Sequence, residues 1–321
     1  MKGLTDIPGI RVGHASDFDS LTGCTAILCP TGAVAGVDIR GSATGTQELD
    51  VLNPLHLTPH IHGICFAGGS AFGLEAVSGV RKWLEGKGIG FETGVATVPL
   101  VVGAILFDLG IGKTDVRPGR EMGFAAAEAA TDGPVAEGCV GAGTGATVGK
   151  VFGMKQAMKS GIGSFSTEVP GTSVRVAALA VVNAYGDVVH PMTKTVIAGA
   201  RKGPSSREFA GSADAIKKGA RGGFGGGNTT LAVVATNARL SKTEATKLAQ
   251  LAQHGLVQAI SPVHTMHDGD LVIAMSCGTE TAGITQLGVI AAEVMAETIL
   301  RAARSAWTLG AVPGLATPPS K

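Results

Sequence analysis

The run Gly225-Gly226-Gly227-Asn228-Thr229-Thr230 leads directly into the apolar stretch Leu231-Ala232-Val233-Val234-Ala235-Thr236. Glycine has no Cβ and reaches strained backbone conformations, so the first part of this sequence is unusually deformable. The second part is short, apolar and preceded by a loop, which predicts a strand that is buried on both faces. Such strands belong to sheets that are covered by further layers, and we therefore expect an α/β fold of stacked sheets flanked by helices.

Segments on either side repeat this alternation of short apolar runs and longer helical patterns. Leu74, Val77, Val80 and Leu84 recur at helical spacing, for example. The sequence that begins at Ser241 has Glu three residues later, which is the pattern of a capping box at a helix start. Strands are expected at residues 24–29, 63–67, 175–183, 231–236 and 271–276, and helices at residues 71–84, 121–130, 241–259 and 284–303.

Two segments lack such periodicity. Residues 190–227 are polar and rich in Gly, Ser and Lys, so we expect an irregular and functional or mobile loop just before Asn228. Residues 310–321 contain three prolines and two glycines, and we expect a loose tail. Because no internal repeat is present, residues 1–321 are predicted to form a single domain.

Composition excludes several classes of protein. Hydrophobic residues make up 45% of the chain and charged residues 16%, which suits a large core and some self-association. The net charge is +1 with no cluster of Lys or Arg, so nucleic acid is not an expected partner. No apolar run reaches the roughly 18 residues of a membrane span, and the N-terminus lacks the apolar core of a signal peptide. We therefore expect a cytoplasmic protein without a membrane partner.

The cysteines are odd in number and include no C-x-x-C pair. This pattern predicts reduced, buried thiols and no zinc site, and we expect neither a bound metal nor a cofactor. The five residues are Cys24, Cys29, Cys65, Cys139 and Cys277.

Thr229 is the first candidate for chemistry. Its hydroxyl is placed to attack the carbonyl of Asn228, and cleavage of that peptide bond would give Thr229 a free α-amine. The nucleophile and its general base would then belong to one residue, as in N-terminal-threonine catalysis. The alternative is an ordinary loop that enters a strand, with threonine present for its β-propensity.

Asp268 and Asp270 are the second candidate, in the sequence His267-Asp268-Gly269-Asp270 before an apolar strand. Side chains at i and i+2 of an extended chain point to the same side, and close like charges raise at least one carboxyl pKa. Either aspartate could orient Thr229 or its neighbours. One alternative is an Asp-Gly turn. Another is a metal site formed by His264 and His267 with the two aspartates, although the spacing matches no zinc motif.

Two further residues are candidates for the same cleft. Lys150 ends the glycine-rich run of residues 141–150, which matches a dinucleotide fingerprint only formally because no strand–turn–helix surrounds it. Lys150 is either a cation that reaches into a cleft or a surface lysine. Asn183 ends an apolar strand, where its amide either donates to an oxyanion or begins a turn.

Together these motifs resemble the self-processing L-aminopeptidase/D-esterase family, which includes β-aminopeptidases and the 6-aminohexanoate-oligomer (nylon oligomer) hydrolase. The resemblance runs from about residue 4 to about residue 303, and several separated motifs appear in one order. The residues that carry it are Leu4 to His14, Ala67 to Leu74, Gly149-Lys150-Val151, Gly227 to Thr230 with the following strand, and His267 to Asp270.

The resemblance implies a four-layer α/β/β/α sandwich that resembles the N-terminal-nucleophile hydrolases. It implies one self-cleavage between Asn228 and Thr229, which gives an α chain of residues 1–228 and a β chain of residues 229–321 that remain associated. Thr229 matches the family's nucleophile, Asp268 and Asp270 match the acidic pair of the nylon oligomer enzyme, and Asn183 and Lys150 match residues of the catalytic cleft. Tetramers of the processed heterodimer are expected.

The implied function is an amidohydrolase or aminopeptidase that cleaves small peptides, amides or esters through an acyl-enzyme. Alternatives are an acyltransferase with the same threonine chemistry, a nylon-oligomer-type amide hydrolase, and a non-catalytic binding or assembly protein that never matures. One departure concerns Phe107, which stands where family members often have Tyr. The cleft of this chain therefore lacks a hydroxyl, which bears on substrate preference.

Overall fold

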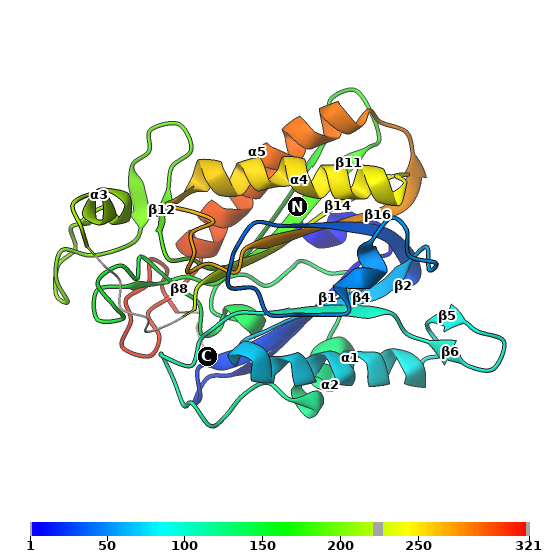
Figure 1. Cartoon of the computed structure of the whole chain (residues 1–321), viewed down its shortest axis with the longest axis horizontal. Helices are drawn as coiled ribbons and strands as arrows, with labels where there is room; N and C mark the ends of the chain where they lie inside the picture. Colours follow the sequence, from blue (N-terminus) through cyan, green and yellow to red (C-terminus); the bar gives the residue numbers. More distant parts are fainter. Residues whose placement is uncertain (1, 221–226, 319–321) are drawn as a thin grey trace.

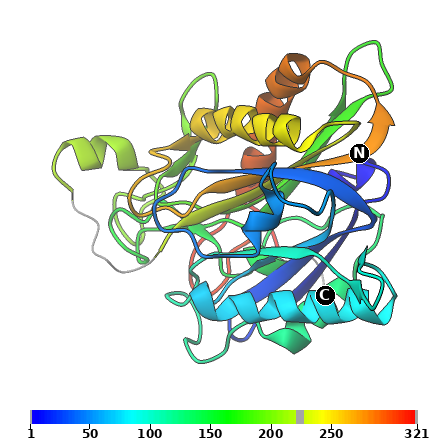
Figure 2. The ribbon, with the colours of Figure 1, turned by 45° about the vertical axis from the view of Figure 1, so that its right-hand side comes forward.

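The computed structural model describes residues 2–220 and 227–318 and has four layers (Figure 1). Helices α4 (Lys242–Ala259) and α5 (Ile284–Arg304) cover one outer face. Helices α1 (Glu75–Gly86) and α2 (Arg120–Glu128) cover the opposite face, and the strands lie between the two helix pairs (Figure 2). The predicted α/β/β/α sandwich is confirmed.

One nine-stranded sheet in the described residues folds over to make both strand layers. The first layer has the order β10-β11-β14-β16-β2, in which β14 and β16 are parallel neighbours. The second layer has the order β2-β4-β7-β3, with β1 also paired to β2. The strands are β1 (Arg11–Asp17), β2 (Thr22–Ile39), β3 (Thr46–Gln47), β4 (Ile61–Ala67), β7 (Val101–Ile105), β10 (Ile162–Glu168), β11 (Arg175–Asn183), β14 (Thr229–Ala238) and β16 (Leu271–Glu280).

Strand β2 belongs to both layers. Its first half pairs with β4 from Cys24 to Leu28, and its second half pairs with β16 from Val34 to Ile39. Gly32 lies between the halves with a φ of 84°, a conformation that favours glycine because it has no Cβ. The two ends of this 18-residue strand consequently return to the same end of the molecule.

Three apolar clusters separate the four layers. The central cluster lies between the sheets and includes Phe66 from β4 and Val233 from β14. A second cluster joins the first layer to α4 and α5, and a third joins the second layer to α1 and α2. Val233 faces the central cluster while its neighbour Val234 faces the helices, because side chains of a strand alternate between faces. This explains why the sequence from Leu231 onward is apolar without interruption.

Shorter elements complete the described chain. The 3-10 helices are η1 (Leu4–Asp6), η2 (Leu49–Leu52), η3 (Ser70–Leu74) and η4 (Gly141–Gly143). Helix α3 is Ser212–Lys217, and the minor strands are β5 (Phe91–Glu92), β6 (Thr97–Val98), β8 (Thr147–Val148), β9 (Met158–Lys159), β12 (Asp187–Val189), β13 (Val196–Ala198) and β15 (Ile260–Ser261).

The strands and helices predicted from periodicity are present, with some differences in their ends. The helix predicted from residue 71 begins as η3, and the strand predicted at residues 24–29 is part of the longer β2. The capping box at Ser241 is confirmed, since its hydroxyl accepts from Glu244 N and its N–H donates to the Glu244 carboxylate. All five cysteines are free, and four of them are buried.

The prediction of an irregular segment at residues 190–227 is wrong in part, because β13 and α3 lie within it. The buried carboxylate of Asp187 orders this segment by accepting from Ala200 N and from the N–H and hydroxyl of Ser212. Residues 221–226 of that segment, including Gly225 and Gly226, lie outside the described residues.

The prediction of a loose tail is wrong for residues 310–316. Leu315 N and Ala316 N both donate to Ala306 O, and Pro313 O accepts from Lys159 N at 2.8 Å. Main-chain hydrogen bonds therefore fix a segment whose composition alone indicated disorder.

Candidate active site

The junction between Asn228 and Thr229 lies at the start of β14, between β11 and β16. The Thr229 hydroxyl is 2.5 Å from the carbonyl oxygen of Asn228 and donates to it. The N–H of Gly269 donates to the same oxygen at 2.7 Å. Two donors thus polarise the carbonyl that precedes the threonine, and one of them is the threonine hydroxyl itself.

Gly269 is held close to this junction by its lack of a side chain. A Cβ at Gly269 would lie 2.8 Å from Thr229 Oγ1 and 2.6 Å from Ala43 O. Both separations are too short for a carbon atom, so only glycine brings its N–H to the Asn228 carbonyl without displacing its neighbours. Sequence reasoning treated Gly269 only as part of a turn and missed this contact.

Asn183 lies opposite Thr229 in the antiparallel pairing of β11 with β14. Its Oδ1 accepts from Thr147 N at 3.0 Å and from Lys150 Nζ at 2.8 Å. Its Nδ2 donates to the main-chain oxygen of Phe107 at 3.0 Å. The Asn183 side chain thus holds the segments of Thr147, Lys150 and Phe107 together, and the chain bends directly after it, at residues 185–186, before β12 begins.

Lys150 points into the cleft, so the surface-lysine alternative is wrong. Its Nζ also donates to Asn183 O at 2.9 Å. Burial lowers the pKa of Lys150 to about 7, although the charge of Asp268 acts in the opposite direction. Lys150 therefore titrates near neutral pH.

The glycine-rich run before Lys150 serves close packing. A Cβ at Gly143 would lie 2.7 Å from Ile162 N. Gly149 has a φ of 71°, and a Cβ there would lie 2.0 Å from Ala200 N. Lys159, which sequence reasoning missed, is buried beneath the run and donates to Thr144 O and Ala146 O. Burial lowers the pKa of Lys159 to about 8. A lysine in a short strand is normally exposed, so the sequence held no signal for this role.

Asp268 and Asp270 are buried beside the junction, each only 1% exposed. Asp268 accepts from Tyr185 N and from the N–H and hydroxyl of Thr265. Burial raises the pKa of Asp268, and the nearby charge of Asp270 raises it further. Asp268 is thus held by fixed donors close enough for its charge to act on Lys150.

Asp270 contacts the junction through Thr230, the residue after Thr229. Its Oδ1 accepts from Thr230 N at 2.7 Å, and its Oδ2 accepts from the N–H of His264 and interacts with His264 Nδ1 at 2.9 Å. The hydroxyl of Thr229 donates to Asn228 O instead of to either aspartate. Of the two contacts expected from the sequence, the structure thus has the one to a neighbour of Thr229, which is Thr230 N, and its role in orienting Thr229 stays a prediction.

The metal alternative for His264 and Asp270 has no support in the described chain. Within residues 2–220 and 227–318, no group of three or more His, Cys, Asp or Glu is placed to hold a metal ion. His264 is instead a hydrogen-bond partner of Asp270, a role that the sequence alone did not distinguish from a ligand.

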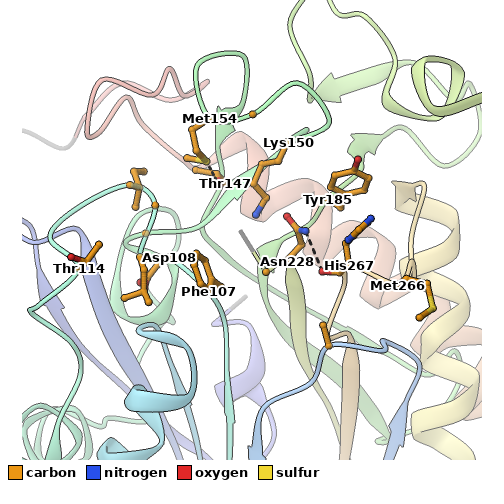
Figure 3. A pocket seen from close by; sticks show the side chains of 17 residues that line it. Phe107, Asp108, Thr114, Thr147, Lys150, Met154, Tyr185, Asn228, Met266 and His267 are labelled. Atoms are coloured by element: carbon orange, nitrogen blue, oxygen red, sulfur yellow. Dashed lines mark hydrogen bonds between the residues drawn. The ribbon is translucent and has the colours of Figure 1, made fainter. Parts of the chain in front are cut away.

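A cavity of about 560 Å³ opens in front of the junction (Figure 3). Of the six predicted site residues, Lys150 and Asn228 line it, whereas Thr229, Asn183, Asp268 and Asp270 lie in the wall behind them. The other lining residues are Ala43, Phe107, Asp108, Leu109, Gly110, Ile111, Thr114, Gly145, Thr147, Gly153, Met154, Tyr185, Gly227, Met266 and His267.

The two strand layers contribute opposite walls of this cavity. Asp108 follows β7, and its Oδ2 accepts from Thr22 Oγ1 at the first residue of β2. At the other end of β2, Arg40 N and Gly41 N donate to Asp270 O. The site therefore lies where both ends of β2 meet the loops of the two layers.

Among the described residues no helix is long and apolar enough to cross a membrane.

Comparison with known proteins places this arrangement in a family. A family model described as Peptidase family S58 matches residues 2–315. The chain is 36% identical to an uncharacterised aminopeptidase of Mycobacterium leprae (strain TN), over 98% of this chain and 93% of that protein. It is 32% identical to a 6-aminohexanoate-oligomer endohydrolase of Agromyces sp. (strain KY5R), over 93% of this chain and 85% of that protein.

Solved structures share the fold. A β-aminopeptidase of Burkholderia sp. has a TM-score of 0.67 at 22% identity, covering 98% of this chain and 91% of that chain. The L-aminopeptidase D-Ala-esterase/amidase of Ochrobactrum anthropi, described as a variant of the Ntn hydrolase fold, has a TM-score of 0.71 at 17% identity, covering 95% and 86%. The resemblance found in the sequence is confirmed, and the protein is a hydrolase of the peptidase and amidase class. The chain belongs to peptidase family S58.

Proposed function

We propose that the chain cuts itself between Asn228 and Thr229 and then acts as an N-terminal-threonine amidohydrolase. The observation that supports this most is the convergence of Thr229 Oγ1 and Gly269 N–H on one carbonyl oxygen, at 2.5 and 2.7 Å. A nucleophile and an oxyanion donor at the same carbonyl are the two groups that acyl transfer requires.

In the cutting step, Thr229 Oγ attacks the carbonyl carbon of Asn228, and the developing oxyanion accepts from Gly269 N–H. The C–N bond then breaks, an ester joins Asn228 to the threonine oxygen, and the released α-amine takes the hydroxyl proton. Water hydrolyses the ester, leaving a carboxyl on Asn228 and a free hydroxyl on Thr229. The pieces have 228 and 93 residues.

In turnover, the same hydroxyl attacks the carbonyl of a small peptide, amide or ester. The α-amine of Thr229 takes the proton and returns it to the leaving group; free α-amines have a pKa of about 7.7–8.0, which suits a base near neutral pH. Water then hydrolyses the acyl-enzyme to release a carboxylic acid. Asn183, Lys150, Asp268 and Asp270 position the threonine segment from two sides.

The two pieces are expected to stay together after cutting. Strand β14 would begin the second piece, and it pairs with β11 of the first piece over eight residue positions from Thr229 to Thr236. Helices α4 and α5 would cover a sheet to which both pieces contribute. Assembly into tetramers of the processed heterodimer is part of the same proposal.

A denaturing gel with N-terminal sequencing tests the proposal. The purified protein is expected to give two bands, and the smaller one should begin Thr-Thr-Leu-Ala. Thr229→Ala is expected to remain one 32.1 kDa chain without activity, whereas Thr230→Ala, the register control, should still be cut. A single band in an active preparation would contradict self-cleavage. A single inert band would instead favour the non-catalytic alternative.

Product analysis separates hydrolysis from the acyltransferase alternative. The cut protein is incubated with an amide substrate in the presence and absence of an added amine. Free carboxylic acid is the expected product in both cases, whereas a product acylated on the added amine would indicate acyl transfer.

A further inference from the structure

Two cysteines from different parts of the sheet meet near the bend of β2. Cys29 lies in β2 three residues before Gly32. Cys277 lies in β16, one residue beyond Ser276, which forms the last pair of the β16–β2 ladder with Val34. The Sγ atoms of Cys29 and Cys277 are 3.8 Å apart, so the two thiols are in contact.

Both side chains face the space between the two strand layers. Cys29 belongs to the central apolar cluster, as does Ile27 two residues earlier in the same strand. Cys277 packs against this cluster, to which Met275 also belongs, because every second side chain of a strand points the same way. Cys29 follows the half of β2 that pairs with β4, whereas Cys277 is part of β16 in the first layer. A bond between the two sulfurs would therefore join the layers.

The pair is accessible from one side. Cys277 is partly exposed and Cys29 is buried, so a small oxidant reaches the pair from the Cys277 side. The contact with Cys277 lowers the pKa of Cys29, which favours the thiolate that oxidation requires. The sulfur atoms of a disulfide are about 2 Å apart, so each sulfur has to move by less than about 1 Å.

A second cysteine pair offers an internal comparison. Cys24 and Cys65 lie on the neighbouring strands β2 and β4, in the cluster beneath α1 and α2, and both are fully buried. The contact with Cys65 raises the pKa of Cys24 well above its ordinary value. Access and thiolate character thus both favour oxidation of Cys29 and Cys277 over oxidation of this second pair.

We propose that Cys29 and Cys277 form a redox site, at which a peroxide converts the two thiols into a disulfide that a thiol reductant opens again. Each thiol loses one proton and one electron, a bond forms between the two sulfurs, and hydrogen peroxide is reduced to two molecules of water. In the cut protein Cys29 belongs to the first piece, and Cys277 is the only cysteine of the second. The disulfide would then join the two pieces covalently. This consequence rests on the proposed function, whereas the disulfide itself does not.

Two denaturing gels test the site on the cut wild-type protein. The protein is treated with hydrogen peroxide, and the remaining thiols are blocked with iodoacetamide. Without reductant we expect one band near 32.1 kDa, and with dithiothreitol we expect two bands. Cys29→Ser and Cys277→Ser should each give two bands on both gels. Cys139→Ser is the control and should behave as wild type, because Cys139 is buried and contacts the main-chain oxygen of Trp307.

Three results would overturn the inference. Two bands from the oxidised wild type without reductant would show that no bond joins the pieces. A band at twice the mass of the smaller piece would show that Cys277 bonds to its counterpart in a second copy. A joined band that persists in Cys29→Ser would assign the bond to another cysteine.

Urea unfolding supplies a second readout. A cross-link restricts the unfolded chains, so the urea midpoint of the oxidised wild type should lie roughly 1 M above that of the reduced wild type. Cys277→Ser, treated in the same way, should show no such shift. Equal midpoints of the oxidised and reduced wild type would contradict a bond that ties the two layers together.

Peptide mapping keeps this result separate from the proposed function. Trypsin releases Cys29 within residues 12–40 and Cys277 within residues 248–301. The oxidised wild type should yield these two peptides as one linked species, which Cys29→Ser should lack. An uncut protein that yields the linked species retains the redox site and contradicts self-cleavage alone. A cut protein that does not yield it retains the proposed function and loses only the redox site.

Discussion

Asn183 and Thr229 are directly opposite each other in the antiparallel pairing of β11 and β14. Asn183 also accepts Lys150 Nζ at two oxygens, one in its side chain and one in its main chain, at 2.8 and 2.9 Å. The strand pairing therefore fixes the distance between the threonine and the lysine through a single intermediate residue. The following predictions change single groups near the junction, one at a time.

Asn183→Ala removes the acceptor for Thr147 N and one of the two acceptors for Lys150 Nζ. We expect self-cleavage to slow at least about 100-fold, because displacement of a catalytic segment by about 1 Å has effects of that size. The measurement is the fraction of cut chain over time on a denaturing gel. Asn53→Ala is the control, since Asn53 is exposed and caps only a local turn. Equal cutting rates in the two variants would contradict a role for Asn183.

Lys150 is expected to make folding stability depend on pH. Its pKa is about 7 in the folded chain and near 10.5 when exposed. Between pH 7 and pH 10.5, Lys150 is therefore protonated in the unfolded chain and neutral in the folded chain. The contribution of Lys150 to the free energy of unfolding therefore rises from pH 7 to pH 10, and it is constant below about pH 6. The measurement is urea unfolding of two uncut proteins, the Thr229→Ala variant and the double variant that also carries Lys150→Met. We expect the difference in free energy of unfolding between the two variants to change by about 2–4 kcal/mol over this range. A difference that stays constant with pH would contradict a lowered pKa of Lys150.

Gly269→Ala is expected to block self-cleavage. The added methyl group would lie 2.8 Å from Thr229 Oγ1, so the hydroxyl or the donor N–H must move away from the Asn228 carbonyl. Gly203→Ala is the matched control, because a Cβ at Gly203 meets no atom within 4 Å. The readout is again the two-band pattern. Normal cutting by Gly269→Ala would contradict the expectation that the added methyl group displaces the Thr229 hydroxyl or the donor N–H.

Asp270→Asn is expected to slow cutting and to destabilise the chain by about 1–3 kcal/mol. Both carboxylate oxygens accept main-chain donors, so in either orientation the new NH₂ group would face an N–H of Thr230 or His264. Asp214→Asn is the control, because Asp214 forms only an exposed ion pair with Lys217. Urea unfolding in the Thr229→Ala background gives the stability change. A change within about 0.5 kcal/mol, as for a typical surface substitution, would contradict the proposed support by Asp270.

The layers of the fold were predictable from the sequence because the spacing of apolar residues along the chain indicates which faces of a strand or helix are buried. Uninterrupted apolar runs such as residues 231–236 indicate strands covered on both faces, and helical spacing in residues 284–303 indicates the outer layer. The regular or fixed structure of the tail and of the segment before Asn228 was less predictable. There the structure depends on single long-range contacts, such as Asp187 with Ser212 and Lys159 with Pro313, which leave no periodic signal.

The site was predictable as a set of residues but not as a set of contacts. Asn183, Lys150, Asp268, Asp270 and the Asn228–Thr229 junction do come together. Which atoms meet could not be derived, because the partners are mostly main-chain groups whose positions depend on strand register. Gly269 shows this most clearly, since its contribution is an N–H and the absence of a side chain.

Strand β2 connects the two walls of the cavity: it runs away from the cavity to Gly32 and then returns to it. One end carries Thr22, which binds Asp108, and the other leads to Arg40 and Gly41, which bind Asp270 O. The bend at Gly32 lies about 30 Å of chain away from the first of these contacts. A small change in curvature at Gly32 would therefore widen or narrow the entrance without altering any group that a substrate touches. Adaptation to larger or smaller molecules can thus proceed through remote substitutions that leave the reacting atoms in place.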